Sequence, residues 1–203
     1  MNAQDAETFA RCIMVGGVAV FPADTVYGLA CEPDSRLAVE RLYALKGREP
    51  HKPAAVMFFA LDLALAALPD LGERTADALR RLLPGPVTLL VPNPGRRFPL
   101  ACARDPETLG VRVPRLAGAT GALAAMRWPV LQSSANATGA PDPRRLDAVP
   151  ESIRREADLV LDGGELPGTP STVIDLRRLE TEGTWETVRA GALAPAEVAR
   201  ALG

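Results

Sequence analysis

Prolines and glycines divide this chain into short segments, and this dense punctuation limits its helices and strands to short lengths. Between the breaks, short apolar runs typical of buried strands alternate with stretches whose apolar residues recur at helical spacing. Strands that alternate with helices predict the α/β class. Because 47% of the 203 residues are hydrophobic and 24% are charged, we expect residues 1–203 to bury a full core as one domain, or as one domain with a modest appendage.

The predicted elements follow from this alternation and from the turn residues that bound each segment. Asp34 or Ser35 is expected to cap a helix that ends at Lys46-Gly47, with Leu37, Leu42 and Leu45 on its inner face. The residues from Pro22 to this cap are predicted to form a loop. The other predicted helices are 7–15, 75–83, 118–126, 147–157 and a short one from Pro195, and the predicted strands are 18–21, 54–59, 87–91, 109–113, 130–132, 159–161, 171–176 and 186–189.

Charge and cysteine usage exclude several classes of protein. A formal net charge of -2 argues against a protein whose main task is to coat nucleic acid. Cys12, Cys31 and Cys102 lie far apart and outside any CxxC spacing, which indicates neither a disulfide framework nor a zinc site. No apolar run is long enough for a membrane span, and acids occupy the N-terminus where a signal peptide is basic. We therefore expect a cytoplasmic protein with no membrane partner.

The only two lysines, Lys46 and Lys52, fall in one seven-residue stretch that also contains Arg48. In a chain whose other positive charges are arginine, lysine is expected where a compact ammonium is required. This clustering predicts an anion site, with phosphate as the first candidate. The alternative is a solvated helix end, where cations favour the C-terminal dipole.

Three further polar segments adjoin predicted strands, which is where ligand sites gather in open α/β sheets. Residues 22–29 supply a carboxylate, a hydroxyl and a phenol, 132–139 supply small hydrogen-bonding side chains, and 169–175 lead hydroxyls into a strand. The alternatives are a surface turn, a helix cap or Asx turn, and simple strand entry, respectively. None is a Walker loop or a dinucleotide fingerprint, and no GxSxG surrounds the serines.

Taken together, six ordered motifs resemble the threonylcarbamoyl-AMP synthase family from Gly17 to Arg189. They are FPADTVYGL, KGR followed by Lys-Pro, PGPVTLL, GVRVP, SSANATG and STVID. The resemblance implies an open, twisted, largely mixed sheet with flanking helices around a large concave cavity, in the short, single-domain form. It implies a nucleotidyltransferase that makes threonylcarbamoyl-adenylate and pyrophosphate from L-threonine, bicarbonate or CO₂, and ATP. The product would pass to a tRNA threonylcarbamoyl transferase complex for threonylcarbamoyladenosine modification, and a weak tRNA contact with this chain is left open.

The same resemblance assigns roles to individual residues. Lys46 and Arg48 would be catalytic, because cations offset the charge that builds on the leaving pyrophosphate. Mg²⁺ is expected through the ATP phosphates and not through protein ligands, and Tyr27 and Lys52 are further candidates for the site. The resemblance places ATP at Lys46, Arg48, Thr108, Ser134, Asn136, Arg144 and Arg189, and threonine at Thr25, Arg112, Ser171 and Thr172.

Two departures from the family pattern and two alternative functions accompany this interpretation. Ala23 stands where the family usually has threonine, and Met57 where it often has histidine. Two effects are open: weaker threonine binding, or a preference for a similar small amino acid such as serine. The first alternative is an RNA-binding protein of the same fold, since a basic concave surface can accept an RNA strand. The second is a nucleotide-binding relative that hydrolyses a carbamoyl-adenylate.

Overall fold

A mixed sheet of nine strands forms the centre of the computed structural model, which describes residues 1–203. The strand order is β7-β1-β2-β6-β3-β5-β4-β8-β9, in which β1/β7, β3/β5 and β4/β8 are parallel and the other neighbours antiparallel. The predicted α/β class and the open mixed sheet are therefore confirmed. The strands are β1 Ala19–Pro22, β2 Tyr27–Cys31, β3 Ala55–Met57, β4 Val87–Pro92, β5 Thr108–Arg112, β6 Val130–Ser134, β7 Leu159–Val160, β8 Thr172–Asp175 and β9 Glu186–Arg189.

Helices flank this sheet, and local capping sets where several of them begin and end. The first helix starts four residues before its predicted start, because Asn2 and Asp5 form a reciprocal capping box. Ser35, and not Asp34, caps the second helix, and Gly47 ends it in the left-handed region at φ 58°. The helices are α1 Ala3–Met14, α2 Arg36–Lys46, α3 Leu61–Ala67, α4 Glu73–Leu82, α5 Pro99–Cys102, α6 Glu151–Glu156, α7 Leu179–Glu182 and α8 Pro195–Leu202, with 3₁₀ turns η1 Gly118–Ala125 and η2 Leu146–Ala148.

Three expectations from the sequence are wrong. The predicted loop after Pro22 contains β2, which pairs with β1 on one side and β6 on the other. Leu37 is 70% exposed, because the inner face of α2 begins one residue later at Ala38. The helix predicted over 147–157 is broken at Pro150, which lacks an amide N–H and disfavours helical backbone in the residue before it.

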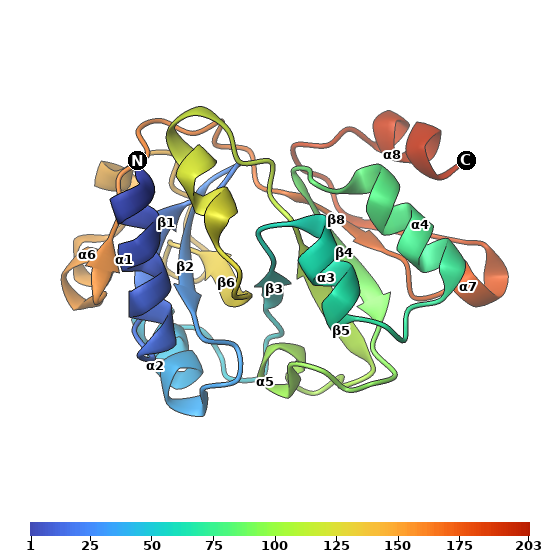
Figure 1. Ribbon diagram of the computed structural model, residues 1–203, viewed down its shortest axis with the longest axis horizontal. Coiled ribbons are helices and arrows are strands. Elements are labelled where there is room, and N and C mark those ends of the chain that lie inside the picture. The colour runs from blue at the N-terminus through green and yellow to red at the C-terminus, as the bar shows by residue number, and fades with distance from the viewer.

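The two faces of the sheet are packed unequally. Alternate strand residues such as Leu89, Val111 and Ile174 belong to the larger core, which α2, α3 and α4 cover. The opposite face carries a smaller core under α1 and η1, in which Phe9 packs against Phe21 at 5.2 Å between ring centroids. In Figure 1, α1 lies over β1 and β2 at one end, and α3 and α4 over β4 and β5 at the other.

The smaller core ends at β3, in the middle of the sheet. On β3, Met57 belongs to it, but Ala55 on the same face does not. On β6, Val130 belongs to it, but Gln132 does not. The face of β3, β5, β4 and β8 beyond these residues is therefore left uncovered.

The pairing between β8 and the edge strand β9 contains a one-residue β-bulge. Val173 pairs with Arg189 and Ile174 pairs with Thr187, so Val188 is an extra residue without a partner in the ladder. Such a bulge shifts every following side chain to the other face of the sheet.

No helix of the molecule combines the length and the apolarity that a membrane crossing needs.

Candidate functional site

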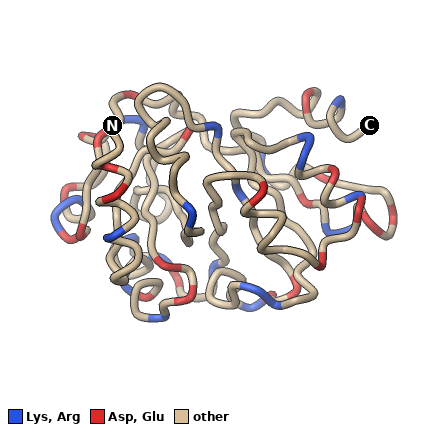
Figure 2. Tube along the Cα trace, in the orientation of Figure 1, with Lys and Arg blue, Asp and Glu red and all other residues tan.

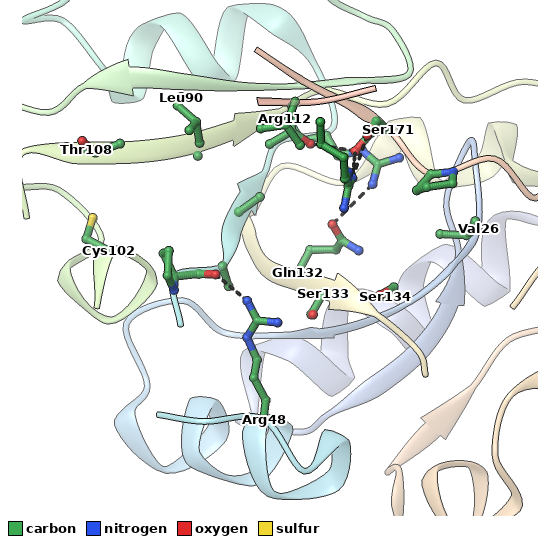
Figure 3. A pocket seen from close by; sticks show the side chains of 18 of the residues that line it. Val26, Arg48, Leu90, Cys102, Thr108, Arg112, Gln132, Ser133, Ser134 and Ser171 are labelled. Carbon is green, nitrogen blue, oxygen red and sulfur yellow. Dashed lines mark hydrogen bonds between the residues drawn. The ribbon is translucent and has the colours of Figure 1, made fainter. Parts of the chain in front are cut away.

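A cavity of about 390 Å³ opens on the uncovered part of the sheet. On β4 and β5 its floor consists of alternate strand residues, because side chains two apart along a strand share one face. The volume lies within the range of pockets that bind small molecules. The strand residues that line it, several of them labelled in Figure 3, are Ala55, Thr88, Leu90, Thr108, Gly110, Arg112, Gln132, Ser133, Ser134, Val173 and Arg189.

The cavity wall carries more positive than negative side chains, although two of its arginines are paired with acids behind it, Arg112 with Asp24 and Arg177 with Asp175. Four arginines line it, against two acids, Asp105 and Asp142. One of these acids is partly offset, since Asp105 Oδ2 lies 3.6 Å from Arg177 Nη1. Two of the arginines, Arg112 and Arg189, lie near each other. Burial and the charge of Arg112 both lower the pKa of Arg189. Such a wall suits a ligand with several negative charges.

Arg112 is 3% exposed and forms the centre of the polar end of the cavity. Its Nη2 donates to Asp24 Oδ1 at 2.5 Å and to Thr25 Oγ1 at 2.6 Å. Its Nη1 makes a longer hydrogen bond, of 3.4 Å, to Gln132 Oε1. Its Nε is buried and has no partner. The guanidinium thus forms a buried ion pair with Asp24, and its Nη1 has only the long contact to Gln132.

Arg189 reaches the cavity from the edge strand β9. Its Nη2 donates to Ser171 O at 2.6 Å and lies 3.3 Å from Ser171 Oγ. Ser171 Oγ in turn lies 2.9 Å from Thr88 Oγ1, within a buried hydroxyl pair. The three side chains form a chain of hydrogen bonds along one wall of the cavity. Figure 3 shows Ser171 of this chain beside Arg112.

Lys46 lies behind the cavity wall and is 4% exposed. Its Nζ donates to Asn136 Oδ1 and Ser134 O at 2.6 Å, to Asn136 O at 2.9 Å and to Ser134 Oγ at 3.2 Å. Burial and the neighbouring Arg48 lower the pKa of Lys46 to about 8. Since an ammonium has three hydrogens, these four oxygens engage all of them, and Lys46 holds the 134–136 segment in place.

Arg48 lines the opposite wall of the cavity. Its Nη2 donates to Pro53 O at 2.6 Å, and its guanidinium carbon lies 5.6 Å from the centre of the Tyr43 ring. Its Nε is buried without a partner, as is that of Arg112. Figure 3 shows the Arg48 side chain extending toward the cavity from below.

The structure thus brings most of the candidate residues to one place. The cavity is lined by six of them: Arg48, Thr108, Arg112, Ser134, Ser171 and Arg189. Three more contact these residues directly from behind: Lys46, Thr25 and Asn136.

Three other candidate residues lie elsewhere, as do the two positions that depart from the resembled pattern. Arg144 pairs with the exposed Glu165, and Lys52 Nζ lies 3.8 Å from Glu49 Oε1 at the surface. The Thr172 hydroxyl donates to Leu193 O at 2.7 Å on the core face of β8. Ala23 and Met57 are both fully buried in the smaller core and do not line the cavity.

Tyr27 also points away from the cavity. Its hydroxyl lies 2.8 Å from Asp162 Oδ1 and from Gly164 O, and it accepts a hydrogen bond from Gly163 N at 3.0 Å. Burial raises the pKa of Tyr27 to about 12. Its contacts fix the 162–164 turn and place no group in the cavity.

Several cavity residues were missed at the level of the sequence. Thr88 and Gln132 fall within motifs already singled out, so alternation along the strands could have found them. Arg177 carried no such signal, because it reaches the cavity rim from beyond β8 while paired with Asp175. No group of three or more His, Cys, Asp or Glu side chains is placed to hold a metal ion.

Residues 11–191 match the family model for Sua5, YciO and YrdC, whose description reads "Telomere recombination". The chain belongs to this family. Among curated relatives, the threonylcarbamoyl-AMP synthase of Stutzerimonas stutzeri is 34% identical over 176 residues, which cover 83% of this chain and 90% of that protein. The synthase of Pyrococcus abyssi is 31% identical over 94% of this chain, which spans only 55% of that relative's length.

Solved structures give the same family placement. The crystal structure of P. abyssi Sua5 complexed with L-threonine matches with a TM-score of 0.86 at 28% identity, over 100% of this chain and 58% of that one. The crystal structure of Escherichia coli YciO covers 97% of this chain and 94% of its own with a TM-score of 0.81. Its identity of 22% shows a shared fold alone. In the YrdC/Sua5 family, this chain therefore has relatives of similar length as well as longer ones.

Proposed function

We propose that the protein is an L-threonylcarbamoyladenylate synthase of one domain, residues 1–203. Its substrates would be ATP, L-threonine and bicarbonate or CO₂, and its products threonylcarbamoyl-AMP and pyrophosphate. The observation that carries the proposal is the single cavity into which four arginines and several hydroxyls converge, in a chain whose relatives of 34% identity are synthases of this kind. A triphosphate, a carbamate and a carboxylate together need such a cationic wall.

The cavity offers separate places for the two larger substrates. The amino acid carboxylate would lie on Arg112, whose Nη1 has only a long contact to Gln132, with the Ser171 hydroxyl beside it. The triphosphate would extend toward Arg48 and Arg189, with Ser134 at the α-phosphate. Lys46 would act there through Ser134 and Asn136, which it holds by hydrogen bonds.

The reaction needs no protein nucleophile. The amine of threonine adds to the carbon of CO₂ and loses a proton, which gives an N-carboxylate. An oxygen of this carboxylate then forms a bond to the α-phosphorus of ATP, and the bond from that phosphorus to pyrophosphate breaks. The protein mainly holds the two substrates in line and offsets the charge that develops on the leaving group.

Mg²⁺ fits this arrangement as a companion of ATP. The cavity wall supplies arginines and hydroxyls, and its two carboxylates do not form a ligand cluster, so the phosphate oxygens would hold the ion. When bound, Mg²⁺ neutralises phosphate charge. The product would then be consumed by a tRNA threonylcarbamoyl transferase complex. Figure 2 shows basic and acidic residues mixed along the Cα trace, which favours a small-molecule enzyme over an RNA-coating protein.

Mass spectrometry of the reaction mixture tests the proposal directly. With ATP, Mg²⁺, threonine and bicarbonate present, we expect threonylcarbamoyl-AMP, and no product when threonine or bicarbonate is omitted. Arg48→Ala should lower kcat/KM by about 100-fold, in the range of a lost contact to a developing charge. Arg81→Ala is the matched control, because Arg81 pairs with Asp77 on the surface of α4.

Other outcomes would favour the alternatives. Nucleotide turnover that needs neither threonine nor bicarbonate would indicate a hydrolysing relative. RNA binding that survives Arg48→Ala, without nucleotide turnover, would indicate an RNA-binding protein of this fold. Full pyrophosphate release by Arg48→Ala would contradict the role given to that residue.

A further inference from the structure

Two backbone segments pack unusually closely beside the cavity. Residues 170–172 enter β8, and residues 189–193 leave β9; we call this pair the Ser171 clasp. Ala192 N donates to Pro170 O at 2.8 Å, and Arg189 Nη2 donates to Ser171 O at 2.6 Å. The clasp therefore joins two cavity residues, Arg189 and Ser171, through backbone and side chain together.

Gly191 allows this close approach. A Cβ atom at position 191 would lie 2.3 Å from Pro170 O and 2.6 Å from Thr172 N, distances that real side chains do not tolerate. Both obstructing atoms belong to the backbone and cannot rotate away. The segment after Arg189 can lie against Pro170 and Ser171 only with glycine at this position.

Thr172 closes the clasp from the core face. Its Oγ1 donates to Leu193 O at 2.7 Å and accepts from Leu193 N at 2.9 Å, and the side chain is fully buried. One hydroxyl thus satisfies both backbone groups of Leu193. Because these groups are held within the fold, loss of the hydroxyl would release the segment that follows Arg189.

The bulge at Val188 decides which face Arg189 occupies. Arg189 pairs with Val173, which lines the cavity, and residues directly opposite in a ladder share a face. Without the extra residue, Arg189 would pair with Thr172 and point toward the core. The bulge turns the Arg189 side chain to the cavity face, and the clasp then holds it there by hydrogen bonds. This occurs although every residue of β9 is exposed.

We propose that Thr172 and Gly191 are positioning residues, which hold Arg189 and Ser171 in the geometry that binds the nucleotide and the amino acid. The inference rests on the proposed function for the identity of the ligands. A long arginine side chain on an exposed edge strand loses rotamer freedom when it binds a ligand. The clasp removes part of that freedom before the ligand arrives.

A double-mutant cycle tests this inference through the Kd for ATP with Mg²⁺, measured calorimetrically without threonine or bicarbonate. Thr172→Val should raise the Kd by about tenfold, because small misplacements of positioning groups have effects of at least this size. In an Arg189→Ala background, the same change should alter the Kd by less than about twofold, since contacting residues are not additive. Thr172→Ser keeps the hydroxyl and should restore wild-type affinity.

Thr75→Val is the matched stability control. Thr75 is fully buried and its hydroxyl contacts Glu180 at 3.3 Å, at the start of α4 and outside the cavity. We expect this variant to lose thermal stability without a change in the Kd for ATP. Gly191→Ala provides a second perturbation of the clasp and should reproduce the Kd of Thr172→Val, again only when Arg189 is present.

The outcomes distinguish failure of the clasp inference from failure of the proposed function. If the Thr172→Val effect is equal in both backgrounds, or if Thr172→Ser fails to restore affinity, Thr172 does not act through Arg189 and the inference is overturned. A wild-type protein that binds ATP but makes no threonylcarbamoyl-AMP would refute the proposed function and leave the clasp standing. A wild-type protein that binds no ATP would overturn both.

Discussion

The burial of Lys46 predicts a specific dependence of stability on pH. Lys46 is 4% exposed, and burial with the neighbouring Arg48 lowers its pKa from 10.5 to about 8. In the unfolded chain the lysine keeps its proton up to about pH 10.4. Between these two values the unfolded state binds more protons than the folded state, so stability should rise with pH.

The magnitude follows from the pKa difference. One proton contributes about 1.4 kcal/mol per pH unit, so the lysine should add about 3 kcal/mol to the free energy of unfolding between pH 8 and 10.5. Below pH 7 both states hold the proton, and the contribution should not change with pH. The variant Lys46→Met, which has a similar length and no charge, isolates this contribution.

The assay is urea unfolding of the wild type and of Lys46→Met, followed by tryptophan fluorescence at several values from pH 6 to 10. The quantity of interest is the difference in unfolding free energy between the two proteins. Tyr27 and Cys31, whose pKa values burial raises to about 12, titrate in both proteins and cancel. A difference that is flat from pH 7 to 10 would refute the reasoning, because Lys46 would then ionise alike in both states.

Two further predictions separate the cavity from its surroundings. Gly110→Val should weaken ATP binding at least about tenfold with little change in Tm, because a Cβ at Gly110 lies at a tolerable 3.4 Å from Ala55 Cα while the branch enters the cavity; a calorimetric Kd equal to the wild type would contradict the proposed binding place. Tyr27→Phe should lower the free energy of unfolding by about 1–2 kcal/mol and keep kcat/KM within twofold, because its hydroxyl bonds Asp162 and Gly163 away from the cavity. A large loss of activity in a stable Tyr27→Phe protein would show that the 162–164 turn takes part in catalysis.

Local signals explain why much of the fold could be predicted from the sequence. Gly47 and Ser35, one of the two caps expected, act within one turn of the helix ends that they define, so a single sequence locates these ends to within one residue. The strand β2 was missed because its residues are buried on both faces and show no alternation. Leu37 was misplaced because spacing gives the period of a helix, while its rotation depends on the surrounding fold.

The candidate site shows the same division. Arg48, Arg112 and Ser171 follow ordered motifs, and the structure places them around one cavity. Lys46 was expected to face the ligand, but its orientation depends on the oxygens of a segment 88 or more residues away in sequence. The direction of a long side chain is set by such distant partners, which a motif does not contain.

The alternation along β4 and β5 has a consequence for how such a protein can change. Odd-numbered residues such as Leu89 and Val111 lie in the larger core, whereas even-numbered ones such as Leu90 and Gly110 face the cavity. Point substitutions at even positions can therefore remodel the pocket without reducing the packing that sustains the fold. An insertion or deletion of one residue in either strand would exchange the two sets and damage both. Substitutions at these positions can thus change substrate preference in this fold, whereas changes in strand length cannot do so without damaging the core.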